Sequence, residues 1–232
     1  GGVGSRMRGA RVPKQFLELG GKSIIAHTID HFEKHPMVAG VVVVCVASGM
    51  DHMRAIVEDA HYTKVLSIVS GGETGQDSIF MGLFELNRLG VTDEDSIVLI
   101  HDGVRPLIDE QTITACIDSV SQYGPTATVA PSPETIIEEE NGVVERVVDR
   151  SRCKLARAPQ GFKFNDIFAE HLRARKEGRH DFIDSISLMS YYGHEVHTVE
   201  GPADNIKVTT QRDFFAFKGF MDYKEMEQLW PL

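Results

Sequence analysis

The strongest constraint on this chain is an alternation of short apolar runs with longer amphipathic stretches. The apolar runs read as buried strands and lie at residues 41–47, 65–69, 96–101 and 126–130. Stretches with helical spacing lie between them, at residues 24–33, 76–89 and 110–122. Strands that alternate with helices are typical of parallel βαβ units. The sequence therefore predicts an α/β fold around a mostly parallel central sheet.

The pattern changes at residue 134, where two strand-like runs flank Asn141-Gly142. Asn-Gly between such runs is the strongest short hairpin signal, because both residues tolerate positive φ. Two strands alone are only marginally stable in water, so we expect a hairpin arm at about 134–150 that packs on another surface, such as a second subunit. Farther on, helices are expected near 165–176 and 183–192, strands at 195–199 and 206–208, and a last helix from about residue 211.

Composition excludes several classes of protein. With 42% hydrophobic and 25% charged residues, the chain has an ordinary globular balance. No stretch approaches the roughly 20 apolar residues of a membrane span. The net charge of −10 argues against a general nucleic-acid binder. Acidic residues in the aromatic-rich C-terminal stretch oppose binding to anionic lipid, so we expect it to pack on the core or on a partner subunit.

The cysteines are too few and too scattered for a structural framework. Cys45, Cys116 and Cys153 match neither a disulfide pattern nor a zinc ligand set. No signal peptide opens the sequence, so a reducing cytoplasm is the expected location. With no internal repeat and no Pro- or Ser-rich linker, residues 1–232 are expected to form a single domain.

The N-terminal segment combines glycines with positive charge. Residues 1–17 hold no acidic side chain and four basic ones, which are Arg6, Arg8, Arg11 and Lys14. Glycines let a backbone approach a phosphate closely and offer its N–H groups. The spacing is not that of the dinucleotide fingerprint, because Met7 stands at the third glycine position. A focused anion site is one interpretation, and a solvated N-terminus is the other.

A second candidate segment follows a predicted buried strand. The run 97–101 leads directly into Asp102, and Arg105 follows three residues later. Ligands of open α/β sheets bind outside the carboxyl ends of the strands, where an aspartate can hold Mg²⁺ on a substrate phosphate. The alternative is an aspartate that only caps a turn, beside a surface arginine.

A third candidate segment spans residues 200–209. Lys207 lies there between two apolar residues and close to Asp204 and Asn205. A lysine in that setting is poorly explained by a solvated strand face, although an edge strand remains the alternative.

Three histidines form a weaker candidate for a site. His27, His31 and His35 share one face of a predicted helix but lack the glutamate of a zinc motif. We expect that histidine face to lie toward solvent.

Five motifs in order carry a family resemblance. They are GGVGSRM…PKQFLELGGKSIIAHTI, GGETGQDSI, VLIHDGVRP, VVDRSR…APQGF and EGPADNIKVTTQRDF, and they span Gly1 to about Phe217. The sequence resembles the 2-C-methyl-D-erythritol 4-phosphate cytidylyltransferases and the closely related ribitol-5-phosphate cytidylyltransferases. The resemblance implies a three-layer, Rossmann-like fold of the nucleotide-diphospho-sugar transferase type with a protruding hairpin arm. It also implies CTP-dependent transfer of CMP to a small polyol phosphate, release of pyrophosphate, a requirement for Mg²⁺ and a homodimer.

The resemblance further implies roles for individual residues. Gly2 and Gly4 would surround the triphosphate. Arg6, Lys14 and Lys207 would be the catalytic cations that contact it. Gly72 and Ser78 would lie against the cytidine, and Asp102 would also belong to the CTP site. Metal ligands would be Asp102 and, as a second candidate, Asp204. The acceptor phosphate would be held by Arg105, Thr135 and Arg150.

The sequence also departs from the family pattern. In relatives a strand precedes the first glycines, and the given sequence does not contain that strand. Gly75 stands where many relatives have arginine, Ala158 replaces a threonine, and Ser185 stands where glutamate is common. The last three differences bear on the acceptor and on efficiency rather than on the fold.

The motifs divide between two acceptors. VVDRSR and EGPADNIKVT favour methylerythritol phosphate, whereas the five residues after Met7, the HDGVRP variant and the C-terminal extension favour ribitol phosphate. Together they favour methylerythritol phosphate narrowly. Two other interpretations stay open: a nicotinamide-dependent dehydrogenase, and a nucleotide-binding subunit without catalytic activity.

Overall fold

The computed structural model describes residues 13–229, with side chains to residue 227. Its strands are β1 (Glu18–Leu19), β2 (Lys22–Ser23), β3 (Val41–Cys45), β4 (Val65–Ser70), β5 (Ile97–Ile100), β6 (Thr126–Pro131), β7 (Ile137–Glu140), β8 (Val143–Val147), β9 (Lys154–Lys163) and β10 (His197–Glu200). Its α-helices are α1 (Ile24–Lys34), α2 (Met50–Asp59), α3 (Gly75–Arg88), α4 (Glu110–Tyr123), α5 (Phe164–Lys176), α6 (Ser185–Tyr191) and α7 (Gln211–Leu229). Short 3₁₀ turns lie at Lys14–Phe16, Ala47–Gly49 and Arg150–Arg152.

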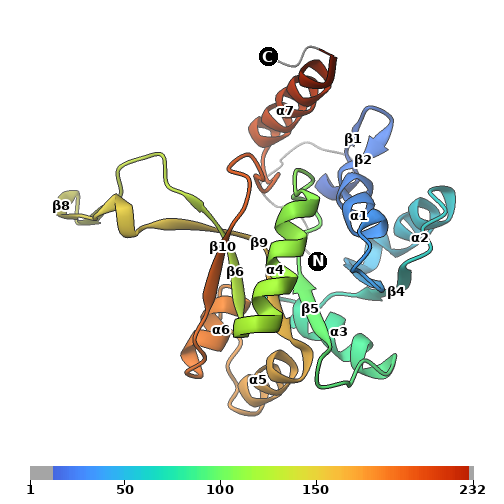
Figure 1. Ribbon diagram of the computed structural model, residues 1–232, viewed down its shortest axis with the longest axis horizontal. Coiled ribbons are helices and arrows are strands. Elements are labelled where there is room, and N and C mark those ends of the chain that lie inside the picture. The colour runs from blue at the N-terminus through green and yellow to red at the C-terminus, as the bar shows by residue number, and fades with distance from the viewer. Residues whose placement is uncertain (1–12, 230–232) are drawn as a thin grey trace.

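Helices cover both faces of the strands, which gives three layers (Figure 1). The two faces of β5 show this directly. Leu99 packs with the buried side chains of α1 and α4, whereas Val98 and Ile100 pack with those of α3 and α5. Successive side chains of a strand point to opposite faces, so a strand with apolar residues at every position must be covered twice. The three-layer α/β fold is confirmed.

The central four-stranded sheet has the order β10-β6-β9-β5 and is mixed. β10 runs parallel to β6, but β9 runs antiparallel to both of its neighbours. β3 and β4 form a separate parallel pair. The sequence pattern did not identify β9 as a strand, and this strand makes the sheet less parallel than expected.

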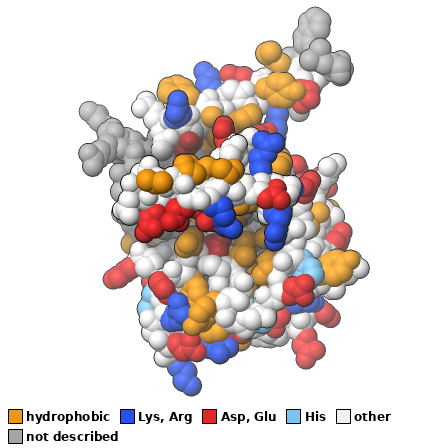
Figure 2. Space-filling model, turned by 90° about the vertical axis from the view of Figure 1, so that its left-hand side faces the viewer, with side chains coloured by type: hydrophobic (Ala, Val, Ile, Leu, Met, Phe, Trp, Pro, Cys, Tyr) orange, Lys and Arg blue, Asp and Glu red, His pale blue; other side chains and the backbone are white. Residues whose placement is uncertain are grey.

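The hairpin arm is confirmed, with β7 and β8 antiparallel and extending away from the layers (Figure 1). Asn141 and Gly142 have φ values of 54° and 83°, as a tight hairpin turn requires. All residues of both strands are exposed. Figure 2 looks onto this side and shows a row of hydrophobic side chains bordered by charged ones. The exposed apolar side chains of the arm are Ile137, Val143, Val144 and Val147.

Two expectations about local structure were wrong. Residues 206–208 form no strand; they are an extended loop in which the Val208 N–H donates to the Val104 carbonyl at 2.8 Å. The histidine face of α1 does not lie toward solvent, because neighbouring segments cover it. Each ring has its own hydrogen-bond partner. His27 contacts the Leu19 carbonyl, His31 contacts the Pro106 carbonyl, and His35 contacts the Thr114 hydroxyl.

The C-terminal helix α7 packs on the core, as expected, through one face. Phe217 is fully buried against a cluster that includes Ile24, Val104 and Leu107. Its opposite face exposes Phe215. Within residues 13–229, no helix combines the length and apolar character that crossing a membrane would require.

Candidate functional site

The loop after β5 places a carboxylate and a guanidinium side by side. Arg105 Nε donates to Asp102 Oδ2 at 2.9 Å, and the Arg105 N–H donates to the Asp102 carbonyl at 3.0 Å. The turn therefore brings the two side chains together by local geometry. The Arg105 side chain is only 11% exposed, so its charge is held in a largely desolvated position.

A second cation reaches the same carboxylate from a distant segment. Lys207 Nζ lies 2.6 Å from Asp102 Oδ1, and the Lys207 side chain is 44% exposed. Burial by itself would raise the pKa of Asp102. The charges of Lys207 and Arg105 outweigh that effect and hold the pKa below its usual value. Asp102 is therefore an ionised carboxylate between two cations.

Asn205 ties this cluster to the sheet. It is fully buried, and its backbone carbonyl accepts from Arg105 Nη1 at 3.0 Å. Its side-chain Nδ2 donates to the carbonyl of Ala158 in β9, also at 3.0 Å. From the sequence, Asn205 stood out only as a neighbour of Lys207. The sequence does not show that Asn205 is completely buried among polar partners, and this was seen only in the folded structure.

His101 supports the same loop as a neutral ring. Its Nε2 donates to the Arg105 carbonyl at 3.1 Å, and its ring lies edge-on to Phe32. Burial lowers the pKa of His101 to about 4. The imidazole therefore fixes the turn without adding a third positive charge next to Asp102.

The two residues expected against the cytidine, Gly72 and Ser78, lie just before α3 and in its first turn. Thr74 caps the helix by accepting from the Asp77 N–H, and Ser78 Oγ donates to the Thr74 carbonyl at 2.9 Å. A Cβ at Gly72 would lie 2.3 Å from that of Asp77, so only glycine fits this close turn. A Cβ at Gly75 would meet nothing within 4 Å. The backbone at Gly75 therefore leaves open space for the first atom of a side chain.

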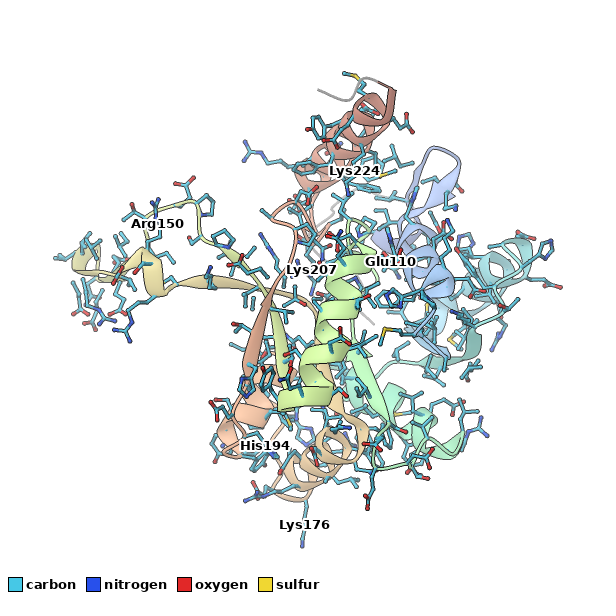
Figure 3. The ribbon with its side chains drawn as sticks, in the orientation of Figure 1. Glu110, Arg150, Lys176, His194, Lys207 and Lys224 are labelled. Atoms are coloured by element: carbon cyan, nitrogen blue, oxygen red, sulfur yellow. The ribbon has the colours of Figure 1, made fainter. Side chains whose placement is uncertain are left out.

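The residues expected on the acceptor do not all meet. Arg150 lies at the base of the arm, where Nη1 donates to the Pro133 carbonyl at 3.1 Å. It borders a hollow lined by residues 131–133, 149–151, 153 and 154. Figure 3 shows Arg150 on the arm, well away from Lys207 in the centre of the molecule. Thr135 is exposed on the same arm. Within one chain, Arg105 is therefore separated from Thr135 and Arg150.

Asp102 is the carboxylate of this site that is best suited to a metal ion. Within residues 13–229, no group of three His, Cys, Asp or Glu side chains gathers to hold an ion. Mg²⁺ in nucleotide sites is commonly held by one or two carboxylates together with substrate phosphates and waters. Asp102 suits that arrangement because it is ionised, its side chain is 33% exposed, and each oxygen keeps a second lone pair beside the cation it already contacts. Asp204, the second candidate, is half-buried in the loop that carries Lys207.

Several predicted residues of the triphosphate loop lie outside the described part of the chain. These are Gly2, Gly4 and Arg6. Lys14 is described and begins the 3₁₀ turn that leads toward β1. The structure thus places Lys14 and Lys207, whereas the glycine loop stays a prediction.

The described residues thus combine a three-layer α/β fold with an ion-paired cluster at the carboxyl end of β5, where ligands of such sheets bind. A family model for IspD, 2-C-methyl-D-erythritol 4-phosphate cytidylyltransferase, matches residues 1–222. The chain belongs to this cytidylyltransferase family.

Its relatives carry two names. The chain is 47% identical over 233 residues to ribitol-5-phosphate cytidylyltransferase of Streptococcus agalactiae serotype V, covering 100% of this chain and 96% of that protein. It is 36% identical over 223 residues to 2-C-methyl-D-erythritol 4-phosphate cytidylyltransferase of Geotalea uraniireducens, covering 95% of this chain and 93% of that protein. The crystal structure of the latter enzyme from Thermus thermophilus matches with a TM-score of 0.75 and 26% identity, over 90% of this chain and 94% of that one.

Proposed function

We propose that this cytidylyltransferase uses ribitol 5-phosphate as its acceptor and forms CDP-ribitol and pyrophosphate from CTP. The single observation that carries the proposal is the 47% identity to a ribitol enzyme over the whole chain, against 36% to a methylerythritol enzyme. This corrects the narrow preference for methylerythritol phosphate drawn from the motifs. On this proposal, VVDRSR and EGPADNIKVT belong to the shared machinery and do not report the acceptor.

The proposed chemistry is one in-line displacement. An oxygen of the acceptor phosphate attacks the α-phosphorus of CTP, a new P–O bond forms, and the bond to the pyrophosphate oxygen breaks. No protein nucleophile is needed, so positioning and charge neutralisation account for most of the catalysis. Lys207 and Arg105 supply positive charge where the reacting phosphates meet. Asp102 holds both cations in place through its two oxygens.

We also propose the remaining roles from the family resemblance. Gly2, Gly4, Arg6 and Lys14 would surround the triphosphate, and Gly72 and Ser78 would contact the cytidine. Asp102, with Asp204 as a weaker candidate, would hold Mg²⁺. When bound, that ion would neutralise phosphate charge and orient the phosphate oxygens.

The assembly we propose is a homodimer through the arm. Exposed apolar side chains on a two-stranded hairpin need a covering surface, and the arm presents four of them. Thr135 and Arg150 would then reach the acceptor site of the partner subunit, which fits their separation from Lys207 within one chain (Figure 3). The reducing cytoplasm, where CTP is available, remains the proposed location, and all three cysteines are free.

The decisive experiment measures pyrophosphate release by the purified chain with CTP, Mg²⁺ and each polyol phosphate separately. We expect kcat/KM to be at least about tenfold higher with ribitol 5-phosphate, which corresponds to about 1.4 kcal/mol of differential transition-state binding. Reactions without acceptor or with ATP replacing CTP are the controls. A higher kcat/KM with methylerythritol phosphate would overturn the acceptor assignment while leaving the cytidylyltransferase activity in place.

A further inference from the structure

Arg157 is a cation in β9 without an ionic partner among residues 13–229. Its Nε is buried and has no hydrogen-bond partner there. Its Nη2 donates to the Ala203 carbonyl at 3.4 Å, close to the limit for such a bond. A buried, unsatisfied guanidinium nitrogen is costly. The position therefore calls for an acceptor that the described residues do not provide.

The surroundings place Arg157 beside the cluster after β5. Its neighbour in the strand, Ala158, accepts from Asn205, and the Asn205 carbonyl in turn accepts from Arg105. Arg157 itself contacts the same loop at Ala203. One short loop, residues 203–207, thus touches Arg157 and Arg105 and carries Lys207.

The charges in this neighbourhood do not balance. Arg105 and Lys207 share one carboxylate, that of Asp102, and Arg157 pairs with none in the described chain. Burial lowers the pKa of Arg157, and the nearby charge of Arg105 lowers it further. Even with Asp204 of the same loop counted, the three cations outnumber two carboxylates, and a phosphate would neutralise the remaining positive charge.

We propose that Arg157 binds the phosphate of the polyol acceptor, together with Arg105 of the same chain. This inference rests on the proposed function and adds a residue to its acceptor site. The free edge of a guanidinium offers two parallel N–H donors, which match two phosphate oxygens. In Arg157 this edge consists of Nε, which has no acceptor, and Nη2, which is only weakly engaged. Because Nε is covered, the side chain must turn to present both donors to a phosphate.

The phosphate of the acceptor fits this position better than its polyol chain. Hydroxyl groups are neutral and would leave the excess charge uncompensated, whereas a phosphate monoester carries a charge of nearly −2 at neutral pH. The same phosphate is the nucleophile, so Arg157 must hold it without blocking the oxygen that attacks the α-phosphorus. Two donors on one edge leave one oxygen free.

The test compares Arg157→Met with the wild-type enzyme. Methionine keeps a long, apolar side chain but removes the charge and the donors. We expect the KM for ribitol 5-phosphate to rise at least about tenfold, the loss typical of a charged hydrogen bond, with the KM for CTP unchanged. Lys163→Met is the matched control, since Lys163 lies at the other end of β9 and pairs with Asp95 at 3.0 Å. The control should leave both KM values unchanged.

Other results would overturn the proposal. Unchanged KM values in Arg157→Met would show that Arg157 contacts neither substrate, and a rise confined to CTP would assign it to the nucleotide. If Arg157→Met does not fold, Arg157→Lys keeps the charge but removes the paired donors, and its KM for the polyol phosphate should still rise severalfold. An unchanged value would refute the paired contact.

A second readout separates this inference from the proposed acceptor. If methylerythritol phosphate proves to be the substrate, the same KM comparison applies to it, because both acceptors carry the phosphate. If neither reacts, the proposed function fails, and inorganic phosphate becomes the probe. It should then raise the melting temperature of the wild type more than that of Arg157→Met. Equal rises in the two proteins would refute the site.

Discussion

Lys207 and Asp102 form a 2.6 Å ion pair that joins the loop after β10 to the loop after β5. The pair lies at the carboxyl end of β5, where ligands of α/β sheets bind. Because Arg105 occupies the other oxygen of the same carboxylate, both cations are positioned before any substrate arrives. Preorganised charge of this kind lowers the cost of stabilising a transition state.

Lys207→Ala should reduce kcat by at least about tenfold, because a charge-assisted contact to phosphate contributes about 1.5–3 kcal/mol. The fold should survive, since the lysine side chain is 44% exposed. Steady-state kinetics and a thermal melt would measure the two effects. Lys163→Ala serves as the control on a lysine that lies at the far end of β9. Wild-type turnover in Lys207→Ala would remove this lysine from the reaction.

Asp102→Asn should abolish most activity while the protein remains folded. Asparagine is nearly isosteric, but it carries no charge to hold Lys207 and Arg105 or to bind a cation. Titrating Mg²⁺ against the rate of pyrophosphate release would test both roles. A variant that keeps its rate and its Mg²⁺ dependence would show that Asp102 has neither.

Arg150→Ala should raise the KM for the polyol phosphate at least about tenfold and leave the KM for CTP close to its wild-type value. The reason is the proposed delivery of Arg150 by the arm to the partner's acceptor site. Arg146→Ala is the control on the same arm, where Arg146 pairs with Glu138 across the hairpin. Sedimentation would give the oligomeric state, and a fully active monomer would contradict a shared site.

His171 should make the protein less stable in acid. It is fully buried with both ring nitrogens unpartnered, and burial, aided by the charge of Arg175, lowers its pKa from 6.5 to about 4. The unfolded chain therefore binds a proton that the folded chain resists, and stability falls as pH drops from 6.5 toward 4. The full loss is about 3 kcal/mol.

The variant His171→Leu removes this titration. Its melting temperature minus that of the wild type should increase steadily as pH is lowered below neutrality. Differential scanning calorimetry across the pH range would measure the difference, and the other histidines contribute equally to both proteins. A difference that stays constant with pH would show that His171 is not responsible.

Gly72→Ala and Gly75→Ala should behave in opposite ways. The new Cβ at Gly72 would lie 2.3 Å from that of Asp77, so the substitution should destabilise the protein by about 1–3 kcal/mol. At Gly75 the new Cβ meets nothing, and alanine should be neutral or stabilising by up to about 1 kcal/mol. Urea unfolding of both variants would show the contrast, and equal stabilities would contradict the close turn at Gly72.

Much of the fold follows from local sequence signals. Apolar runs located the strands from β3 to β6, and helical spacing located α1, α3 and α4, because side-chain periodicity is a property of neighbouring residues. Asn141-Gly142 located the turn of the arm for the same reason. The short segments that hold Asp102, Arg105 and Lys207 could likewise be selected from residue type and position.

Pairing between distant segments came only from the tertiary structure. The sequence alone did not show that Lys207 reaches Asp102, that β9 runs antiparallel beside β5, or that Arg157 lies next to the site. The face of α1 that carries His27 and His31 was assigned to solvent, because its pattern does not reveal which segments pack against it. Residue type and spacing determine what a segment can form locally. Which segments meet depends on the packing of the whole chain, since long-range contacts are decided by burial and strand pairing rather than by nearby residues.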